Sequence, residues 1–442
     1  MLLGKQIQVG LVVDSSLRGP SGLAVPTREL INGLVKLSNE DFRPVCLSLK
    51  RALKLSSKDI ELIHVPHVTL GLKEKVSEAF SITHERLLIT IHALGPAVMG
   101  NLFYYSKEDE DSDRARLEGD LQLLRQQHER LVKIITVSES MRQQIIDYLG
   151  IPREKIAVIY HGVDHSLFHP TENRNDIFGY LRNNYGLRDS PYILHVSHGY
   201  PLKNIPRMLR AYEESKEKGV RHQLVIVGPQ PDAMRELAGK IDGVLLTGPL
   251  PHEELVNFYC CADFLLHPSL YESFSITILE AMACGTPIVT SNCFAMPEIA
   301  GGAALYVDPL DVDSISNAIT RISGDMNLKN SLREIGLKRS ELFSWERCAQ
   351  EHLLLYHSLA SERGRSTDLS IDKLAILNLL SIYDLRQDLQ TAFPDGDKNL
   401  SSLINWAVEV QRGADQETFL LKPYEKWYKE HHKALDSISK RW

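Results

Sequence analysis

The chain has 442 residues, far more than a single ~150-residue domain, which excludes a small module that depends on disulfides or a metal to stay folded. Hydrophobic residues make up 43% and charged residues 24%, a globular composition that excludes an intrinsically disordered protein. The net charge of −7 disfavours a nucleic-acid reader, which usually carries a basic surplus.

The N-terminus predicts a first strand and no leader. Lys5 interrupts its short apolar run, and no cleavage site for a signal peptide follows. No stretch approaches the ~18 continuous apolar residues of a transmembrane helix, so we expect no transmembrane segment and a cytoplasmic location, with a peripheral membrane contact left open. The 6 cysteines are scattered, which indicates reduced thiols.

Short apolar runs alternate with helix-period segments along the first half of the chain. Runs that are apolar throughout and rich in Ile, Val and Leu are typical of strands buried on both faces of a parallel sheet. They cover residues 7–13, 45–49, 62–65, 87–92, 134–137 and 156–160.

The second half repeats this pattern, with runs at 192–196, 224–227, 244–246, 264–267, 288–290 and 305–307. Two such series predict an α/β protein with two doubly wound domains. We expect an N-terminal domain over residues 1–171, a linker over 172–188 and a C-terminal domain over 189–344. Open α/β sheets bind ligands at the carboxyl ends of their strands, which favours a site in a cleft between the domains.

The end of the chain is predicted to be helical. A helix is expected over residues 345–362, and a helical extension over 363–442 that contains Trp406, Trp427 and Trp442. Tryptophans are large apolar side chains that need burial, so we expect the extension to pack on the main body or on a partner.

The most informative segment runs from residue 267 to 290, HPSLYESFSITILEAMACGTPIVT. It reads as strand, loop, helix and strand, with a helix from about Ile276 to Ala283 that Gly285 and Pro287 end. The N-terminus of such a helix offers unpaired N–H groups and a partial positive charge, which suit a phosphate.

Two carboxylates bracket that helix start. Eight helical residues would place Glu272 and Glu280 ~12 Å apart, about the length of a nucleotide-diphosphate sugar from its sugar ring to its ribose. Carboxylates accept hydrogen bonds from paired hydroxyls, so each acid could hold one sugar. A solvated loop residue and a surface helix residue are the structural alternative.

The segment resembles the E-x7-E signature of retaining glycosyltransferase family 4, the large group with the GT-B fold. ITVSESMRQQIIDYLGIPREKIAVIYHGVDHSLFHP (135–170) and HVSHGYPLKNIPRMLRAY (195–212) resemble neighbouring family segments, and FSWERCAQEHLLLYHSL (343–359) resembles the helix that returns to the first domain. The similarity covers roughly residues 5–360 and leaves out the extension.

The resemblance implies a role for each matching residue. Glu280 would bind the ribose, Glu272 the donor sugar and Lys203 the diphosphate. Gly22 would allow a close backbone approach to phosphate, and His92 would lie near the donor sugar. The loop and the helix start would contribute donor contacts, chiefly through backbone N–H groups, from Ser273, Phe274, Ser275, Ile276, Thr277 and Ile278.

Three positions depart from the family pattern. His198 stands where the family has an arginine, so a cation that titrates near neutral pH replaces a permanent one. Ser273 and Ser275 replace the glycines that flank Phe274, and serine resists a positive φ. Ala93 follows His92 where many relatives have Asp. Both acids and Lys203 are retained, which indicates an active enzyme.

Other motifs are weaker. Asp111 and Asp113 form a DxD within KEDEDSDR, which we interpret as a solvated loop. The histidine pairs 165/169 and 431/432 have no cysteine or carboxylate nearby in the sequence, so no metal site is predicted.

The resulting hypothesis is a metal-independent, retaining glycosyltransferase that moves a sugar from a nucleotide-sugar donor to an acceptor hydroxyl on a glycan, a lipid or a small molecule. No cofactor is expected beyond this co-substrate. Two alternatives stay open: a nucleotide-sugar epimerase or hydrolase of the same fold, and a non-catalytic nucleotide-sugar-binding protein.

Overall fold

The computed structural model describes residues 6–13, 24–68, 70, 75–104 and 106–361. They divide into two compact units. Unit 1 contains the described residues up to Leu94 together with 113–161 and 345–361, and unit 2 contains 95–112 and 162–344. Gly22 and the predicted extension over 363–442 lie outside the described residues.

Unit 1 is built on a parallel six-stranded sheet in the order β2-β1-β3-β4-β5-β6. Its strands are β1 (Ile7–Val12), β2 (Phe42–Leu47), β3 (Leu62–Val68), β4 (Leu87–Ile91), β5 (Leu131–Thr136) and β6 (Ile156–Val158). Its helices include α1 (Ala24–Lys36), α2 (Leu49–Ala52), α3 (Lys75–Ser81), α6 (Glu139–Leu149) and α15 (Trp345–Ser361).

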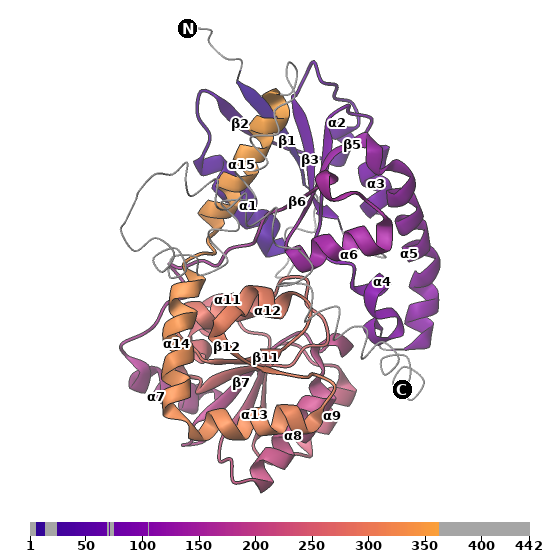
Figure 1. Ribbon diagram of the computed structural model, residues 1–442. Helices are drawn as coiled ribbons and strands as arrows, with labels where there is room; N and C mark the ends of the chain where they lie inside the picture. Colours follow the sequence, from indigo (N-terminus) through magenta and orange to yellow (C-terminus); the bar gives the residue numbers. More distant parts are fainter. Residues whose placement is uncertain (1–5, 14–23, 69, 71–74, 105, 362–442) are drawn as a thin grey trace, which may run out of the picture. The chain divides into compact units, whose positions relative to one another are not determined.

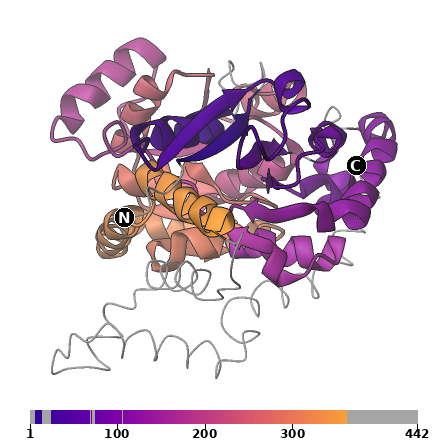
Figure 2. The same cartoon turned by 90° about the horizontal axis from the view of Figure 1, so that it is seen from above.

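Helix α15, orange in Figures 1 and 2, packs beside α1 although some 300 residues of chain separate them. Gly33 of α1 permits this approach, because a Cβ built at Gly33 would lie 2.6 Å from the Cβ of Ala349. The chain therefore returns to its first unit for its last described helix.

Unit 2 has a second parallel six-stranded sheet, in the order β12-β11-β10-β7-β8-β9. Its strands are β7 (Tyr192–Val196), β8 (Gln223–Val227), β9 (Val244–Gly248), β10 (Phe264–His267), β11 (Ile288–Ser291) and β12 (Ala304–Val307). The helices are α4 (Gly95–Met99), α7 (Arg174–Tyr185), α8 (Ile205–Glu217), α9 (Asp232–Gly239), α10 (His252–Cys261), α11 (Ile276–Ala283), α12 (Ala295–Ala300), α13 (Val312–Gly324) and α14 (Met326–Ser340).

In unit 2, α8 and α13 cover one face of the sheet and α11 lies on the other, while α14 runs from α13 to α11 (Figure 1). The strand order reverses direction between β7 and β10, which are neighbours although β8 and β9 separate them in the sequence. Open α/β sheets bind ligands at such a switch point, beyond the carboxyl ends of the strands.

The predicted α/β class with two doubly wound sheets is confirmed, and each predicted apolar run overlaps a strand. Residues 172–188, expected as a linker, contain α7, whose Arg174 side chain donates to the backbone oxygens of Cys261 and Ala262 in unit 2. None of the described helices is both long and apolar enough to cross a membrane.

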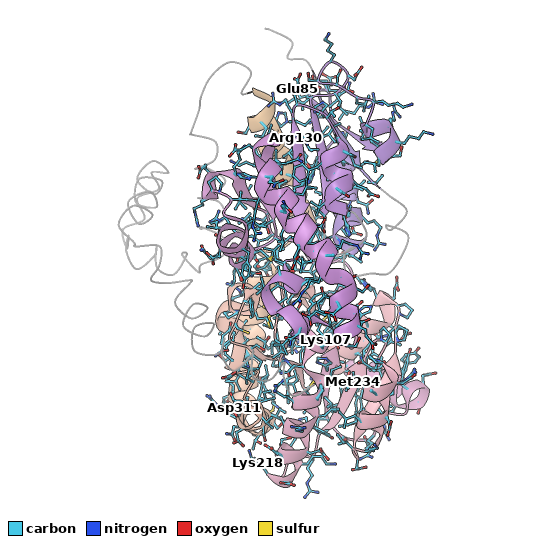
Figure 3. All side chains as sticks on the ribbon, turned by 90° about the vertical axis from the view of Figure 1, so that its right-hand side faces the viewer. Glu85, Lys107, Arg130, Lys218, Met234 and Asp311 are labelled. Carbon is cyan, nitrogen blue, oxygen red and sulfur yellow. The ribbon has the colours of Figure 1, made fainter. Side chains whose placement is uncertain are left out.

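The interpretation of the DxD segment as a loop was wrong. Asp111 and Asp113 lie in α5 (Lys107–Gln127), which Figure 3 shows as one long helix between the labelled Lys107 and Arg130. Ser106 caps it: the Ser106 hydroxyl accepts from the Asp109 N–H at 3.1 Å and donates to the Asp109 carboxylate at 2.9 Å. Acidic side chains in the first turn also suit the positive end of a helix.

Unit 1 contains a group of buried histidine rings. The ring centroids of His92 and His161 are 5.3 Å apart, and those of His64 and His352 are 5.7 Å apart. Burial, with the neighbouring histidines adding to it, lowers the pKa of His92 to about 4, and burial lowers the pKa of His352 to about 4. These rings are therefore neutral at pH 7.

We expect acid to destabilise unit 1. A histidine whose folded pKa lies below its unfolded value of ~6.5 stabilises the fold fully above that value, and the stability is lost as the pH falls toward 4. Two such groups would each remove about 1.4 kcal/mol per pH unit in that window. Hydrogen exchange of β3 and β4 amides at pH 7 and pH 5 measures this loss.

The test variant is His352→Leu, which removes one of these groups and should reduce, without abolishing, the pH dependence of exchange in β3 and β4. Equal protection of these strands at both pH values in the wild type would contradict the assignment.

Candidate functional site

The loop between β10 and α11 carries Glu272, and hydrogen bonds hold most of its carbonyl groups. Donors reach these carbonyls from loops and strands that are distant in the sequence. The Thr290 and Ser291 hydroxyls donate to the carbonyl oxygens of His267 and Ser269 at 2.9 and 2.7 Å. The Ala295 N–H donates to the Glu272 carbonyl oxygen at 3.3 Å. The loop is therefore a rigid support for the Glu272 side chain.

Asn204 ties the loop that carries Lys203 to the same support. Its Nδ2 donates to the carbonyl oxygens of Pro268 at 3.0 Å and Pro309 at 2.6 Å. The Leu270 N–H donates to the Leu202 carbonyl oxygen at 2.7 Å. Lys203 follows β7 and Glu272 follows β10, so these bonds join the two loops at the switch point of the sheet.

Replacing Asn204 should destabilise unit 2 in two separable steps. Asn204 is buried and has the left-handed conformation, with φ 59°. Asn204→Gly keeps that conformation but leaves two carbonyls unpaired, at a cost of about 2 kcal/mol. Asn204→Ala adds the strain of a left-handed alanine, about 1 kcal/mol more. Urea unfolding of the three proteins measures both steps.

The difference between the two variants is the internal control. Equal stability of Asn204→Ala and Asn204→Gly would show that the left-handed conformation at this position carries no strain, and wild-type stability of both would show that the two bonds contribute nothing.

Glu272 lies in a network of charges and hydrogen bonds. Its Oε1 accepts from Lys203 Nζ at 2.6 Å and from His267 Nε2 at 2.9 Å. Burial raises the pKa of the Glu272 carboxyl, but the Lys203 charge and the His267 hydrogen bond outweigh it and hold the pKa well below its usual range. Glu272 is therefore ionised, and its Oε2 accepts no hydrogen bond from any residue that the structure describes.

Glu280 has a different environment, although the pattern of its bonds is similar. It is buried on α11, and its Oε2 accepts from the Tyr259 hydroxyl of α10 at 2.8 Å. Burial raises the pKa of Glu280 to about 7, and the Tyr259 bond opposes that rise. Within the described residues, Oε1 of Glu280 has no hydrogen-bond donor.

The start of α11 lies between the two acids in the sequence. Ser275 precedes the helix with φ 79°, a left-handed conformation that serine adopts at a cost. The Ile278 N–H donates to the Ser275 carbonyl oxygen at 3.2 Å, whereas the N–H groups of Ile276 and Thr277 donate to no described residue. Ser273 and Phe274 complete the predicted segment, with Phe274 buried and Ser273 half-buried.

The remaining predicted residues are less closely grouped. His198 follows β7 and its side chain remains exposed to solvent in part. Partial loss of solvent and the nearby Lys203 charge lower its pKa. His92 lies at the end of β4 in unit 1, where its Nε2 donates to the Pro66 carbonyl oxygen at 2.8 Å. Lys203, Glu272 and Ser275 are thus linked through one network in unit 2, and His92 belongs to the histidine group of unit 1.

The sequence analysis missed His267, Tyr259 and Asn204. His267 is five residues before Glu272 at a strand end, so its contact was local and its polar character in an apolar run was a usable signal. Tyr259 of α10 reaches Glu280 on the neighbouring α11, and Asn204 reaches carbonyl groups of two other loops. No sequence pattern marks either residue. No group of three or more His, Cys, Asp or Glu side chains within the described residues has the arrangement of a metal site.

Two models of known protein families match most of the described chain. The profile described as "Glycosyl transferases group 1" matches residues 181–339, and that of "Glycosyltransferase Family 4" matches residues 6–167. The chain belongs to the family 4 glycosyltransferases. The resemblance carried by the E-x7-E segment is thereby confirmed at the level of the family.

The family 4 relatives include two mannosyltransferases. The O-antigen chain mannosyltransferase B of Escherichia coli is 32% identical over 235 residues, which cover 51% of this chain and 60% of that protein. The MMP alpha-(1->4)-mannosyltransferase of Mycolicibacterium hassiacum is 32% identical over 250 residues, 54% of this chain and 57% of that protein. The matches thus cover less than two thirds of each of these relatives.

Solved structures share the GT-B fold of this family 4 chain. Sucrose-phosphate synthase from Thermosynechococcus elongatus gives a TM-score of 0.63 at 20% identity, with 81% of this chain and 100% of that chain covered. Anabaena HepE in complex with UDP-glucose gives 0.61 at 15% identity, with 80% and 100% covered.

Proposed function

We propose that the protein is a retaining, metal-independent glycosyltransferase that uses a nucleotide-diphosphate sugar. The observation that carries this proposal is the pair Glu272 and Glu280 on either side of the α11 N-terminus. Each acid has one oxygen fixed by the protein and one without a donor among the described residues. Such oxygens are suited to accept hydrogen bonds from sugar hydroxyls.

Each residue has a role in this proposal. Glu280 accepts from the ribose, Glu272 accepts from the transferred sugar, and the diphosphate lies at the N–H groups of Ile276 and Thr277. Lys203, with His198 near it, supplies positive charge where the departing diphosphate gains negative charge. The role of His92 beside the donor sugar, and that of Gly22, rest on the family resemblance alone.

The reaction breaks the bond between the sugar C1 and the phosphate oxygen, whose electron pair leaves with the nucleoside diphosphate. The acceptor hydroxyl oxygen forms the new bond to C1 on the same face, and its proton passes to the departing phosphate. The positive charge of Lys203 and the helix N-terminus together provide the stabilisation that a metal ion gives in other transferases, which supports the metal-independent form of the proposal.

A nucleotide-sugar screen is the first test. GDP-mannose and UDP-glucose are the first donors to try, because two relatives are named mannosyltransferases and one structural neighbour contains UDP-glucose. A ligand that binds the folded state raises the melting temperature. The correct nucleotide sugar should therefore raise the melting temperature of the protein, and the other nucleotide sugar should not.

Product analysis then distinguishes the reaction classes. If the protein is a transferase, a new glycoside forms only when an acceptor is present. A retaining enzyme gives a product with the anomeric configuration of the donor, and a metal-independent enzyme keeps its full turnover rate in the chelator EDTA. Free sugar or an epimerised donor without acceptor would instead indicate a hydrolase or an epimerase, and loss of turnover in EDTA would contradict metal independence.

A further inference from the structure

His267 is the second donor to Oε1 of Glu272, and the two donors differ in mobility. Lys203 reaches Oε1 from a flexible four-carbon side chain that is partly exposed. His267 is the last residue of β10, and its side chain is fully buried. An imidazole has only two side-chain torsions, so the His267 contact is the less mobile of the two.

The hydrogen bonds define the tautomer of His267. Glu272 is ionised and can only accept, so the hydrogen between the two residues is on Nε2 of His267. The hydroxyls of Ser275 and Ser269 lie 3.2 and 3.3 Å from the same nitrogen. Nδ1 is buried without a hydrogen-bond partner among the described residues. A neutral ring with hydrogen on Nε2 alone leaves no buried N–H unpaired.

Ser275 provides further evidence that this contact is built into the site. The residue holds a positive φ that glycine would adopt without strain. Its hydroxyl is buried and lies within hydrogen-bond distance of His267 Nε2. The side chain that costs backbone strain is thus the one that contacts the histidine.

The two donors also have different tasks in the proposed reaction. When the diphosphate binds, Lys203 has a second anion to contact, and its hold on Glu272 weakens. His267 has no other anionic partner among the described residues. Its Nε2–H can therefore hold Oε1 throughout the reaction while Oε2 faces the sugar.

We propose that His267 is a positioning residue that fixes the Glu272 carboxylate through Nε2–H, so that Oε2 is presented to the transferred sugar when Lys203 moves to the diphosphate. This inference rests on the proposed function. The sugar, and not the nucleotide, is the part of the donor that it affects.

The test compares two side chains of the same chemistry and different reach. The amide nitrogen of Gln can occupy the place of His267 Nε2, whereas the shorter Asn reaches only the level of Nδ1. We expect His267→Asn to lower kcat for transfer about 100-fold, and His267→Gln to stay within about 10-fold of the wild type. The dissociation constants of UDP and GDP, which carry no sugar, should change less than about 3-fold in both variants.

His222 supplies a matched control in the same unit. Its Nε2 lies 2.7 Å from Asp263, a carboxylate that also pairs with Lys329, so the group resembles the Glu272 network in composition. His222→Asn therefore breaks a similar buried pair away from the loops at the switch point, and we expect it to lower the melting temperature with kcat near the wild-type value.

The outcomes separate the two proposals. An inactive wild type with every donor and acceptor would overturn the proposed function. An active wild type in which His267→Asn equals His267→Gln in kcat, or in which His222→Asn loses as much kcat as His267→Asn, would overturn the positioning role alone.

Discussion

Glu272→Gln is expected to lower kcat for transfer by about 1000-fold while the fold is retained. Gln keeps the shape of the side chain but removes the negative charge that Lys203 pairs with, and loss of one well-placed polar group in an active site costs 10²–10³-fold. The variant also leaves a partly buried Lys203 unpaired. Steady-state release of nucleoside diphosphate, measured with and without acceptor, gives kcat.

The control for this prediction is Asp263→Asn, which removes the charge from the similar Asp263–Lys329–His222 group. It should cost stability and little kcat. Melting curves of both variants show whether the protein is folded, and turnover of Glu272→Gln at the wild-type rate would remove Glu272 from the site.

The fold could be predicted because each strand is marked by the residues within it. Strands that are buried on both faces are mostly apolar, so each strand of the two described sheets overlapped an apolar run. The edge strand β2 overlapped its run only in part, because it begins with Phe42, Arg43 and Pro44 and is half exposed. The start of α5 was missed for the opposite reason. Its first turns are acidic and lack an apolar stripe, and only the Ser106–Asp109 cap marks the helix.

The candidate site was only partly accessible from the sequence. Glu272, Glu280 and the helix between them lie within one short segment, so spacing and the Gly285–Pro287 stop signal were enough to place them. The partners that control the two acids are further away. Glu280 meets Tyr259 from 21 residues before it, and Asn204 reaches Pro309 across 105 residues. The Tyr259 contact depends on the packing of α10 against α11, and the Asn204 contact depends on the strand order that brings the end of β7 near the end of β12. No pattern in the sequence specifies either arrangement.

The second large effect that we expect is that nucleotide binding depends on pH through the ionisation of Glu280. A ribose hydroxyl donates best to the ionised carboxylate, and burial raises the pKa of Glu280 to about 7. Below pH 7 the carboxyl must lose a proton before it binds, so the dissociation constant of UDP or GDP should rise up to ~10-fold for each pH unit. Above pH 7 this contribution should level off. Calorimetric titrations between pH 5.5 and 8.5 measure the curve.

Two variants assign that curve to Glu280. Glu280→Gln cannot ionise, so its binding should be weaker above pH 7 and should keep only the pH dependence of the nucleotide's own phosphates and of His198. The hydrogen bond from Tyr259 lowers the pKa of Glu280, so Tyr259→Phe should raise that pKa and move the midpoint to higher pH. The sign of this second shift is the decisive point, because a general loss of stability would weaken binding at every pH without moving the midpoint. A midpoint that stays in place in Tyr259→Phe, or a wild-type curve that matches Glu280→Gln, would show that this carboxylate does not hold the ribose.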